Sequence, residues 1–364
     1  MYLLLANTSL GLEKILKQEL KDNGFKIKDV KRGMVYCLIE EENIHKIKEI
    51  RTAERIYMIM KEFKFKKLDD YFDNIYSIDW NEYFDIKDKI IIDKVILNSK
   101  YHKSAKTFQS LTQKSIYKKM MDKYGIDFMM ESNNNFKLRV FIFGIKAVVA
   151  LDLSGDPLHK RNYKKFISKA PLKEHIASSL VLFSNWDKNS PLIDPFCGSG
   201  TIPLEAGLIA ANIPAGFMRE YDYENMLKFS EYTKENYVDI DNPEILGTDK
   251  EDDMIETSLK NYENIKYDLN ISFYKSSMEK VKNNFSKKGS IITNPPYGVR
   301  LEDKKQAIKL VEQMRYLKKE FKGWDLTVIT SLKDFEKYFD DRSSEKIEII
   351  NGKIKSYIFN YKEI

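Results

Sequence analysis

The chain has 364 residues, of which 43% are hydrophobic and 13% aromatic, so it can fold but is long for one core, and we expect roughly two or three domains. It lacks the long apolar run of a transmembrane helix and the opening pattern of a signal peptide, so we expect no membrane attachment. Its two cysteines, Cys37 and Cys197, have neither metal-site nor disulfide spacing, which favours a cytoplasmic location and argues against a bound metal.

The net charge of +6 is unevenly distributed along the chain. Residues 1–170 carry 33 Lys and Arg against 23 Asp and Glu, a net charge of +10, whereas residues 171–364 carry 28 against 32, a net charge of −4. A basic front half joined to a nearly neutral rear half is typical of a protein that captures a polyanion with one part and carries out chemistry with the other. A solvated, lysine-rich surface is the alternative that charge alone leaves open.

Residues 1–60 are predicted to form a small ferredoxin-like module. Strands and helices alternate in this part of the chain, with apolar strands at 2–6, 33–39 and 54–60, an amphipathic helix over 10–23 and a second helix from near Glu42. Two passages of the strand–helix–strand type within so short a segment are the basis of this prediction.

Residues 61–155 are predicted to form a second module, which contains the most basic stretch of the chain, 100–123. The other expected elements are a helix around 68–78 and strands at 90–97, 136–143 and 146–153. The second half of the basic stretch should be a helix with Ile116 and Met120 turned inward and its lysines outward. Phosphate contacts from such a face would be independent of base sequence and sensitive to salt. The candidate contacts are Lys103, Lys106, Lys114, Lys118 and Lys119.

Residues 156–170 combine turn residues and cationic side chains without an apolar period. We therefore expect a linker on the protein surface here. Lys160 and Arg161 are candidate RNA contacts within it.

From residue 171 on, the pattern predicts a doubly wound, Rossmann-like sheet of the α/β class. Apolar strands alternate with helices, and the expected strands are at 191–193, 244–247, 271–275, 290–293 and 324–330. A helix is expected over 304–321. Asn351-Gly352 then forms the two-residue turn of a hairpin between 346–350 and 353–361, which gives the sheet an antiparallel edge.

A glycine-rich turn connects the first of these strands to a helix. The turn, 194–201, reads Asp-Pro-Phe-Cys-Gly-Ser-Gly-Thr, and its geometry lets backbone amides approach a ligand at the carboxyl end of the sheet. It lacks the Gly-Lys-Ser/Thr of a P-loop and the three glycines of the dinucleotide fingerprint. Asp249, at the end of the second strand, is placed to bind a ribose diol, although it could equally cap the helix that follows.

The pentapeptide Asn294-Pro295-Pro296-Tyr297-Gly298 follows the fourth strand. Its two prolines fix the backbone and remove two donors, which leaves carbonyl groups facing outward. The Asn294 carboxamide and the Pro295 carbonyl could accept hydrogen bonds from an exocyclic amine while the Tyr297 ring stacks on the base. A rigid proline-rich turn without chemical function is the alternative for the pentapeptide alone.

The turn 194–201, Asp249 and the Asn294 pentapeptide, in this order, resemble the class I S-adenosylmethionine-dependent methyltransferases that modify amino nitrogens. The segments 211–216 and 295–301 and the Asn351-Gly352 hairpin are similar to THUMP-domain guanine-N2 RNA methyltransferases, whose bacterial members act on 23S ribosomal RNA. The resemblance covers nearly the whole chain, more strongly in 160–364 than in 1–155. It implies four parts, which are a ferredoxin-like module over 1–60, a THUMP RNA-binding domain over 61–155, a linker over 156–170 and a methyltransferase domain over 171–364.

The resemblance also implies a site with S-adenosyl-L-methionine as its cofactor. The residues implied to contact the cofactor are Asp194, Phe196, Gly198, Gly200, Thr201, Asp249, Ser277 and Asn294. Asn294, Pro295 and Tyr297 would hold a guanine that has left its stack, so catalysis would rest on positioning and electrostatics rather than on a strong base. Arg300 would contact phosphate, with a helix-capping salt bridge as its alternative. Ser276-Ser277-Met278 stands where the family often has an acidic or amide residue near the adenine.

Other functions stay open from the sequence. Cys197 as a nucleophile is disfavoured because it lies in the cofactor turn, and Glu205 is expected to pack rather than to catalyse. DNA adenine and protein glutamine methylases use the same Asn-Pro-Pro-Tyr loop, but the basic front half favours RNA. A transfer RNA guanine-N2 methyltransferase is the nearest rival, and an RNA-binding assembly factor without catalysis is the alternative from another class. The sequence leaves the oligomeric state open.

Overall fold

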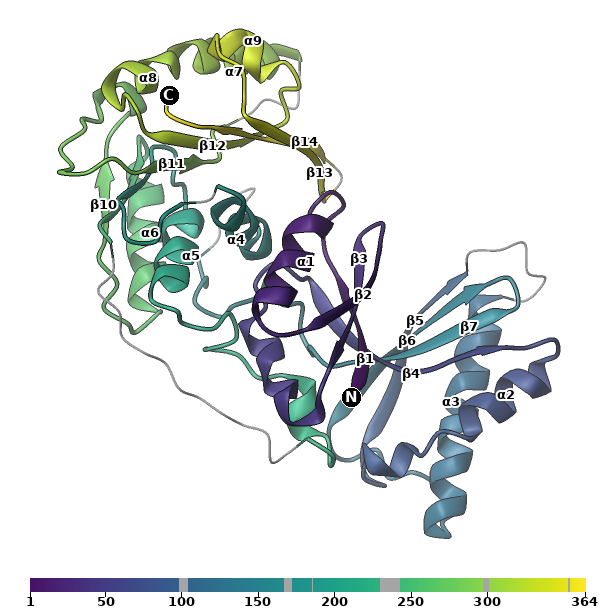
Figure 1. The fold of residues 1–364 in the computed structure, drawn as a ribbon. Coiled ribbons are helices and arrows are strands. Elements are labelled where there is room, and N and C mark those ends of the chain that lie inside the picture. Colours follow the sequence, from purple (N-terminus) through teal and green to yellow (C-terminus); the bar gives the residue numbers. More distant parts are fainter. Residues whose placement is uncertain (98–103, 167–171, 185, 230–242, 297–300, 353) are drawn as a thin grey trace.

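The computed structural model describes residues 1–364 except 98–103, 167–171, 185, 230–242, 297–300 and 353. Within the described residues the chain forms two seven-stranded sheets, one at each end of the molecule (Figure 1). No helix in this part of the chain is long and apolar enough to cross a membrane.

The N-terminal sheet has the strand order β2-β3-β1-β4-β7-β6-β5. Its neighbouring strands pair antiparallel, except that β5 and β6 are parallel. Its elements are β1 (Tyr2–Asn7), α1 (Glu13–Asp22), β2 (Lys26–Lys31), β3 (Met34–Ile39), a 3₁₀ segment (Glu41–Glu49), β4 (Arg55–Lys64), α2 (Leu68–Tyr76), a 3₁₀ turn (Trp80–Glu82), β5 (Lys89–Leu97), α3 (Ala105–Tyr124), β6 (Asn135–Phe143) and β7 (Lys146–Asp152).

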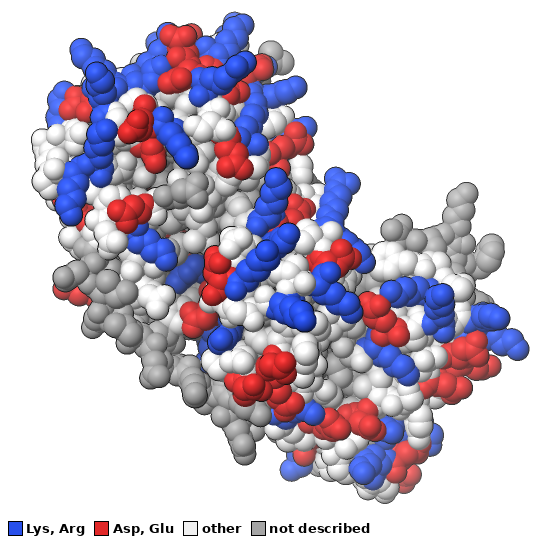
Figure 2. Space-filling view, viewed as in Figure 1, with Lys and Arg blue, Asp and Glu red and all other residues white. Residues whose placement is uncertain are grey.

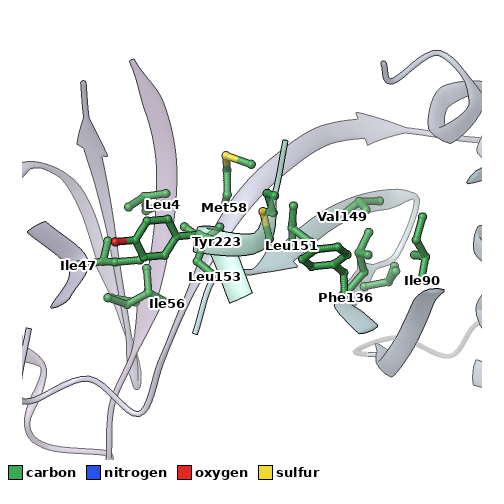
Figure 3. Packing of buried hydrophobic residues seen from close by; sticks show 14 of the residues in the cluster. Leu4, Ile47, Ile56, Met58, Ile90, Phe136, Val149, Leu151, Leu153 and Tyr223 are labelled. Atoms are coloured by element: carbon green, nitrogen blue, oxygen red, sulfur yellow. The ribbon is translucent and has the colours of Figure 1, made fainter. Parts of the chain in front are cut away.

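Strand β4 joins the two expected front modules. It pairs with β1 through Met58 and with β7 through Phe63, so the boundary expected at residue 60 falls inside this strand. The hydrophobic core is also shared, since Leu4, Met58 and Val149 belong to one buried cluster (Figure 3). The sheet is therefore continuous from β2 to β5.

A segment from the rear half completes this front core. Four buried residues from the segment 221–229 belong to the same cluster, namely Tyr221, Tyr223, Met226 and Phe229. Figure 3 shows Tyr223 among Leu4, Ile47 and Ile56. The rings of Phe229 and Tyr2 meet edge to face with their centroids 5.5 Å apart. The two halves of the chain therefore share apolar packing and not only a connecting segment.

Helix α3 confirms the pattern predicted for the basic stretch. Ile116 and Met120 are fully buried, and the helix packs against β5 and α2. Ser104 caps its first turn by accepting a hydrogen bond from the Thr107 amide at 3.2 Å, and Gly125 ends it with a left-handed φ of 64°.

The C-terminal sheet has the order β10-β9-β8-β11-β12-β14-β13, with β8 to β12 parallel and β14 antiparallel to both of its neighbours. This confirms the predicted doubly wound sheet with an antiparallel edge hairpin. Its elements are α4 (Glu174–Phe183), β8 (Leu192–Asp194), α5 (Thr201–Ala210), a 3₁₀ turn (Asp222–Asn225), β9 (Ile245–Asp249), α6 (Asp252–Glu263), β10 (Ile271–Lys275), a 3₁₀ turn (Met278–Lys280), β11 (Ser290–Thr293), α7 (Leu301–Gln313), α8 (Arg315–Glu320), β12 (Asp325–Thr330), α9 (Phe335–Phe339), β13 (Glu345–Asn351) and β14 (Ile354–Tyr361).

Helices cover both faces of this sheet, with α4, α5 and α6 packed on one face and α7, α8 and α9 on the other (Figure 1). The helix expected over 304–321 is divided into α7 and α8 at the buried Met314. Strand β2 was not predicted, because most of its side chains are exposed and charged residues interrupt its apolar alternation.

The segment 156–166 is not the exposed linker that its composition indicates. Leu158, Arg161 and Tyr163 are fully buried, and Arg161 in particular has no exposed surface, so the expectation that Arg161 contacts RNA is wrong. Its guanidinium donates to the carbonyl oxygens of Leu158 at 2.8 Å and Arg51 at 2.7 Å. The segment is thus a packed connection between the two halves.

The negative partner of Arg161 is Glu205, a fully buried residue of α5. Its Oε1 accepts hydrogen bonds from Arg161 Nε at 3.3 Å and from the Tyr163 hydroxyl at 2.7 Å, and Ser178 donates to its Oε2. Burial alone would raise the pKa of Glu205, but the charges of Arg161 and Arg51 outweigh burial and hold it below its ordinary value. Glu205 is therefore an ionised packing residue between the halves, in agreement with the prediction that it does not catalyse.

Candidate active site

The two predicted motifs meet where the order of the parallel strands reverses. Asp194 ends β8, Asn294 follows β11, and these neighbouring strands lie at the centre of the sheet. Helices leave the two sides of this point in opposite directions, which opens a crevice at the carboxyl ends of the strands. The Thr293 hydroxyl donates to Asp194 Oδ1 at 2.6 Å and ties the two strand ends together.

Asp194 is buried, with 1% of its surface exposed. Its Oδ1 accepts a second hydrogen bond from the Phe196 amide at 3.0 Å, while Oδ2 receives none from the described residues. Burial raises the pKa of Asp194 to about 7, although both hydrogen bonds oppose the rise. A cationic ligand would stabilise the ionised form of the Asp194 carboxyl group, so this position favours the binding of a cation.

The two glycines of the turn have different surroundings. Gly198 and Gly200 both have left-handed backbones, with φ of 54° and 82°. A side chain at Gly198 would meet no atom within 4 Å, whereas one at Gly200 would lie 3.1 Å from the Phe273 ring. Gly198 therefore leaves open space for a ligand against the backbone, and Gly200 permits close packing of β10 behind the turn.

Asp249 links the turn to the start of α6. Its Oδ2 accepts from the Gly198 amide at 3.0 Å, and its Oδ1 accepts from the Glu251 amide at 3.1 Å. The bond to the Glu251 amide closes a turn just before the helix, and Glu251 itself occupies the N-cap of α6, so the alternative that Asp249 caps this helix is wrong. Each carboxylate oxygen has a second lone pair, so two hydroxyl groups of a ribose can bind at the same time.

Two adjoining cavities form a cleft along these strand ends. The smaller, of about 280 Å³, is lined by six predicted site residues, Asp194, Phe196, Gly198, Thr201, Asp249 and Asn294. The larger, of about 620 Å³, contains Ser277 and shares Phe196, Asp249 and Pro296 with the smaller one. The structure thus brings together every predicted cofactor residue except Gly200, which lines neither cavity.

Sequence reasoning missed several residues that line the cleft. They are Leu172 and Met254 in the smaller cavity, Gln306 and Leu310 in the larger, and Lys250 in both. Lys250 directly follows Asp249, so its place after a strand end could have revealed it. No pattern distinguishes Leu172 or Met254 from ordinary core residues.

The Asn294 side chain has an unused acceptor. Its Oδ1 is buried and has no hydrogen-bond partner among the residues that the structure describes. Pro295, beside it, is buried, and Pro296 is exposed. Leaving a buried carboxamide oxygen unpaired is costly, so this atom points to a donor supplied by a ligand. Tyr297, Gly298 and Arg300 lie outside the described residues.

Cys197 lines the smaller cavity but does not have the properties of a nucleophile. Burial raises the pKa of its thiol well above the ordinary value, and the nearby Asp194 and Asp249 raise it further. The thiolate is the reactive form of cysteine, and it is disfavoured here. No group of side chains suited to hold a metal ion occurs in the described part of the chain.

The predicted RNA-contact lysines of α3 are present on a surface of mixed charge. Lys106, Lys114 and Lys118 are exposed, while Lys103 lies outside the described residues. Lys118 pairs with Asp122 at 2.6 Å, and Lys119 pairs with Asp79 at 3.2 Å. In the linker, the exposed Lys160 pairs with Asp156 at 3.4 Å. Figure 2 shows basic and acidic side chains interspersed over the face in view rather than one unbroken basic patch.

Two family models match the chain. Residues 161–359 match the model described as "RMKL-like, methyltransferase domain", and residues 3–57 match "RlmL ferredoxin-like domain". The first match covers the rear sheet and the whole cleft. The second covers β1 to the first part of β4, in agreement with the ferredoxin-like module predicted for that region.

Three relatives are similar over most of this chain. "Putative RNA methyltransferase YpsC" of Bacillus subtilis is 30% identical over 99% of this chain and 96% of its own length. "Ribosomal RNA large subunit methyltransferase K/L" of Buchnera aphidicola is 31% identical over 98% of this chain, which spans only 54% of that relative. "tRNA (guanine(6)-N2)-methyltransferase" of Methanocaldococcus jannaschii is 30% identical, with 84% of each chain covered.

The solved structure of SMU.472, determined in complex with SAH, is 27% identical and superimposes with a TM-score of 0.89 over 100% of this chain and 98% of that one. SAH, or S-adenosylhomocysteine, combines an amino acid, a ribose and an adenine. In the present chain Gly198 faces open space, Asp249 has free lone pairs, and Ser277 and Met278 line the far end of the cleft. The residues present therefore fit a ligand of this kind.

Proposed function

The chain belongs to the family of RMKL-like methyltransferase domains, and from this premise we propose that it forms N2-methylguanosine in RNA, with large-subunit ribosomal RNA as the substrate. It is an S-adenosyl-L-methionine-dependent methyltransferase of an RNA-modifying family. The cofactor supplies an electrophilic methyl group when bound. What the chain's own residues must do is hold an amino nitrogen in line with that group.

The observation that carries the proposal is the Oδ1 of Asn294, which has no partner among the described residues and directly follows Thr293, the residue bonded to Asp194. An exocyclic amine offers two N–H groups, and its lone pair is delocalised into the base. If Asn294 Oδ1 and the Pro295 carbonyl accept the two N–H groups, the nitrogen is held with its lone pair toward the methyl group. Orientation of this kind accelerates transfer without a strong base.

The other residues of the cleft would bind the cofactor. The buried Asp194 carboxyl would bind the ammonium group of its amino-acid part, which would lower the pKa of Asp194 and favour the ionised form. Asp249 would accept from the ribose hydroxyls, and Ser277 with Met278 would lie near the adenine. Phe196, which lines both cavities, would form the wall between them.

Two relatives support guanine and ribosomal RNA as the target base and the substrate. The K/L relative supports ribosomal RNA, but this chain spans about half of its length, so the activity of the whole relative is not transferred directly. The archaeal relative that acts on guanine 6 of transfer RNA supports guanine N2 and keeps transfer RNA as the second candidate substrate.

Nucleoside mass spectrometry on separated RNA pools tests the proposal. Ribosomal and transfer RNA are isolated from cells with and without the protein and digested to nucleosides. We expect N2-methylguanosine to decrease in large-subunit ribosomal RNA when the protein is absent. A decrease confined to transfer RNA would establish the rival substrate. Unchanged nucleosides in both pools, together with no uptake of radiolabelled methyl groups by either RNA in vitro, would leave only a non-catalytic role.

A further inference from the structure

A third hollow adjoins the cleft on the side of the connecting segment. Its volume is about 660 Å³, and its lining residues are His159, Lys160, Arg161, Asn162, Lys164, Lys165, Leu172, Lys173 and Glu174. Leu172 also lines the smaller cavity that contains Asn294 and Asp194. The hollow and the methyl-transfer site are therefore neighbours, separated by one side chain.

Cationic side chains dominate this hollow, and their partners separate them into two groups. Arg161 is neutralised by the buried Glu205, and Lys164 is held by the Leu172 carbonyl at 2.7 Å and by Glu174 at 3.8 Å. Both therefore serve the packing of the segment.

The three other lysines that line the hollow are exposed to solvent. Lys160 and Lys173 pair only with acids outside the lining, Asp156 at 3.4 Å and Glu54 at 3.7 Å, and both lysines are more than a third exposed. Lys165 is exposed and makes no ion pair with any described residue. Lys165 can therefore bind a phosphate group directly, and Lys160 and Lys173 can exchange their exposed acidic partners for phosphate, since exposed ion pairs of this kind are weak.

An exposed aromatic ring follows directly after Lys165. Phe166 has 45% of its surface exposed, so its ring is accessible to a ligand. The Lys260 ammonium lies 5.5 Å from the centroid of its ring. Lysines interleaved with an exposed aromatic ring are the combination with which proteins bind single-stranded nucleic acid.

The position of Phe166 is fixed by one buried side chain. Asn261 of α6 accepts from the Phe166 amide and donates to the Phe166 carbonyl, both at 3.2 Å. The same Nδ2 also donates to the Ser199 carbonyl at 3.2 Å, in the glycine-rich turn that lines the cleft. Asn261 is fully buried, so it ties the backbone of Phe166 to the backbone of the turn.

We propose that the exposed side chains of Lys160, Lys165, Phe166 and Lys173 bind the RNA strand beside the target nucleotide, with Phe166 stacking on a neighbouring base and the three lysines contacting phosphates. This inference rests on the proposed function, since the binding of a neighbouring strand requires that RNA occupy the cleft. It assigns to the connecting segment a positioning role that is separate from capture by α3. Phe166 acts on the strand that carries the target and touches no reacting atom.

The first test replaces the ring. Methyl transfer to ribosomal RNA from cells that lack the protein is measured for wild type, Phe166→Ala and Phe166→Tyr, with Phe143→Ala as the control. Phe143 has a similar exposed fraction, 41%, but lies at the end of β6. We expect Phe166→Ala to raise the KM for RNA about tenfold, as loss of one stacking contact does elsewhere. Phe166→Tyr should retain the wild-type KM, and the affinity of all variants for S-adenosylhomocysteine should be unchanged.

The second test addresses the charges. The affinity of Lys165→Ser for the same RNA is measured over a series of salt concentrations, with Lys288→Ser as the control. Lys288 precedes β11 at the amino end of the strands, on the opposite edge of the sheet. Loss of one phosphate contact to a single strand should make the logarithmic salt slope shallower by about 0.7, and the control should keep the wild-type slope.

The results separate this inference from the proposed function. If wild type methylates the RNA but Phe166→Ala has the wild-type KM and Lys165→Ser has the wild-type slope, the segment does not bind the strand. The same conclusion follows if Phe143→Ala and Lys288→Ser weaken binding as much as the variants in the segment. If wild type binds S-adenosylhomocysteine but methylates neither ribosomal nor transfer RNA, the proposed function itself is wrong.

Discussion

The hydroxyl of Thr293 donates a hydrogen bond to the carboxyl group of Asp194 across two neighbouring strands, at 2.6 Å. This bond holds the cofactor turn and the Asn-Pro-Pro motif in one arrangement before any ligand arrives. Catalysis by positioning needs such a preformed arrangement, because the methyl group and the nitrogen must be aligned to a fraction of an ångström. The bond also opposes the effect of burial on the pKa of Asp194.

Replacement of Asp194 by asparagine should stabilise the protein at neutral and alkaline pH. The pKa of Asp194 is about 7 in the folded protein and near 4 in the unfolded chain, so between these values only the folded state retains the proton. The stability contributed by this group therefore falls as the pH rises from about 4 to about 7. We expect Asp194→Asn to raise the free energy of unfolding by about 1–3 kcal/mol at pH 8 and to have little effect at about pH 4.

Urea denaturation of the cofactor-free protein at both pH values measures this effect. Asp127→Asn, which removes an exposed carboxylate in a loop, is the control and should change stability at neither pH. The Asp194 variant should also lose affinity for S-adenosylhomocysteine. A variant that is less stable than wild type at pH 8 would contradict the raised pKa.

The two glycines of the turn should respond differently to alanine. Both have left-handed backbones, so the conformational cost is similar, about 1 kcal/mol each. The added methyl group at Gly200 also meets the Phe273 ring at 3.1 Å, which should cost a further 1–3 kcal/mol or so. The methyl group at Gly198 enters the cleft and should mainly weaken the binding of S-adenosylhomocysteine. Titration calorimetry measures this affinity, and urea denaturation measures the stability of both variants. Wild-type affinity in Gly198→Ala would show that the cofactor does not approach that glycine.

Asn294→Ala should abolish methyl transfer while leaving RNA affinity nearly intact. The carboxamide oxygen that receives the amine is lost, and removal of one such oriented group lowers kcat by about 100- to 1000-fold in other enzymes. Single-turnover methylation measures the rate, and filter binding measures RNA affinity in the same preparation. Equal losses in both measurements would refute the role assigned to Asn294.

Arg161→Ala should destabilise the protein by about 3–5 kcal/mol, because it leaves the buried Glu205 carboxylate without its hydrogen-bonded cation. Lys118→Ala is a matched control, since it also removes a cation from an ion pair, but an exposed one, and should cause no measurable change. Urea denaturation compares the two. A similar effect of both substitutions would mean that burial of the Arg161 pair does not matter.

Reversal of charge at Lys118 and Lys119 tests capture by α3. The double variant Lys118→Glu, Lys119→Glu should bind RNA more weakly and show a shallower salt dependence, because two candidate phosphate contacts become repulsive. Their acidic partners Asp122 and Asp79 would then face like charges, so thermal stability is measured in parallel. Unchanged affinity and salt slope in a folded variant would place the RNA site elsewhere.

Much of the fold could be predicted because its signals are local. The inward face of α3 follows from the spacing of Ile116 and Met120, and the parallel sheet follows from apolar strands that alternate with helices. That Asp194 and Asn294 lie at the same edge of the sheet also follows from sequence, since both come at the ends of parallel strands. The bond from Thr293 to Asp194 does not, because strand order cannot be read from a single chain.

The wrong expectation for Arg161 has a clear physical cause. A cationic segment without apolar periodicity is normally exposed to solvent. One of its cations can be buried only where a buried countercharge pairs with it. The countercharge is Glu205, 44 residues further along the chain, and no local pattern connects the two. Long-range ion pairs of this kind are what composition cannot reveal.

The packing of Tyr221, Tyr223, Met226 and Phe229 into the front core affects how the chain folds during its synthesis. The ribosome delivers the N-terminus first, and N-terminal domains usually fold before the rest has emerged. Here the core of the first sheet lacks four of its side chains until residue 229 has left the exit tunnel. By then β8 and α5 have also been made. The front sheet therefore completes its packing only after the first elements of the rear half have been made, whereas β8 must still wait for its neighbours β9 and β11.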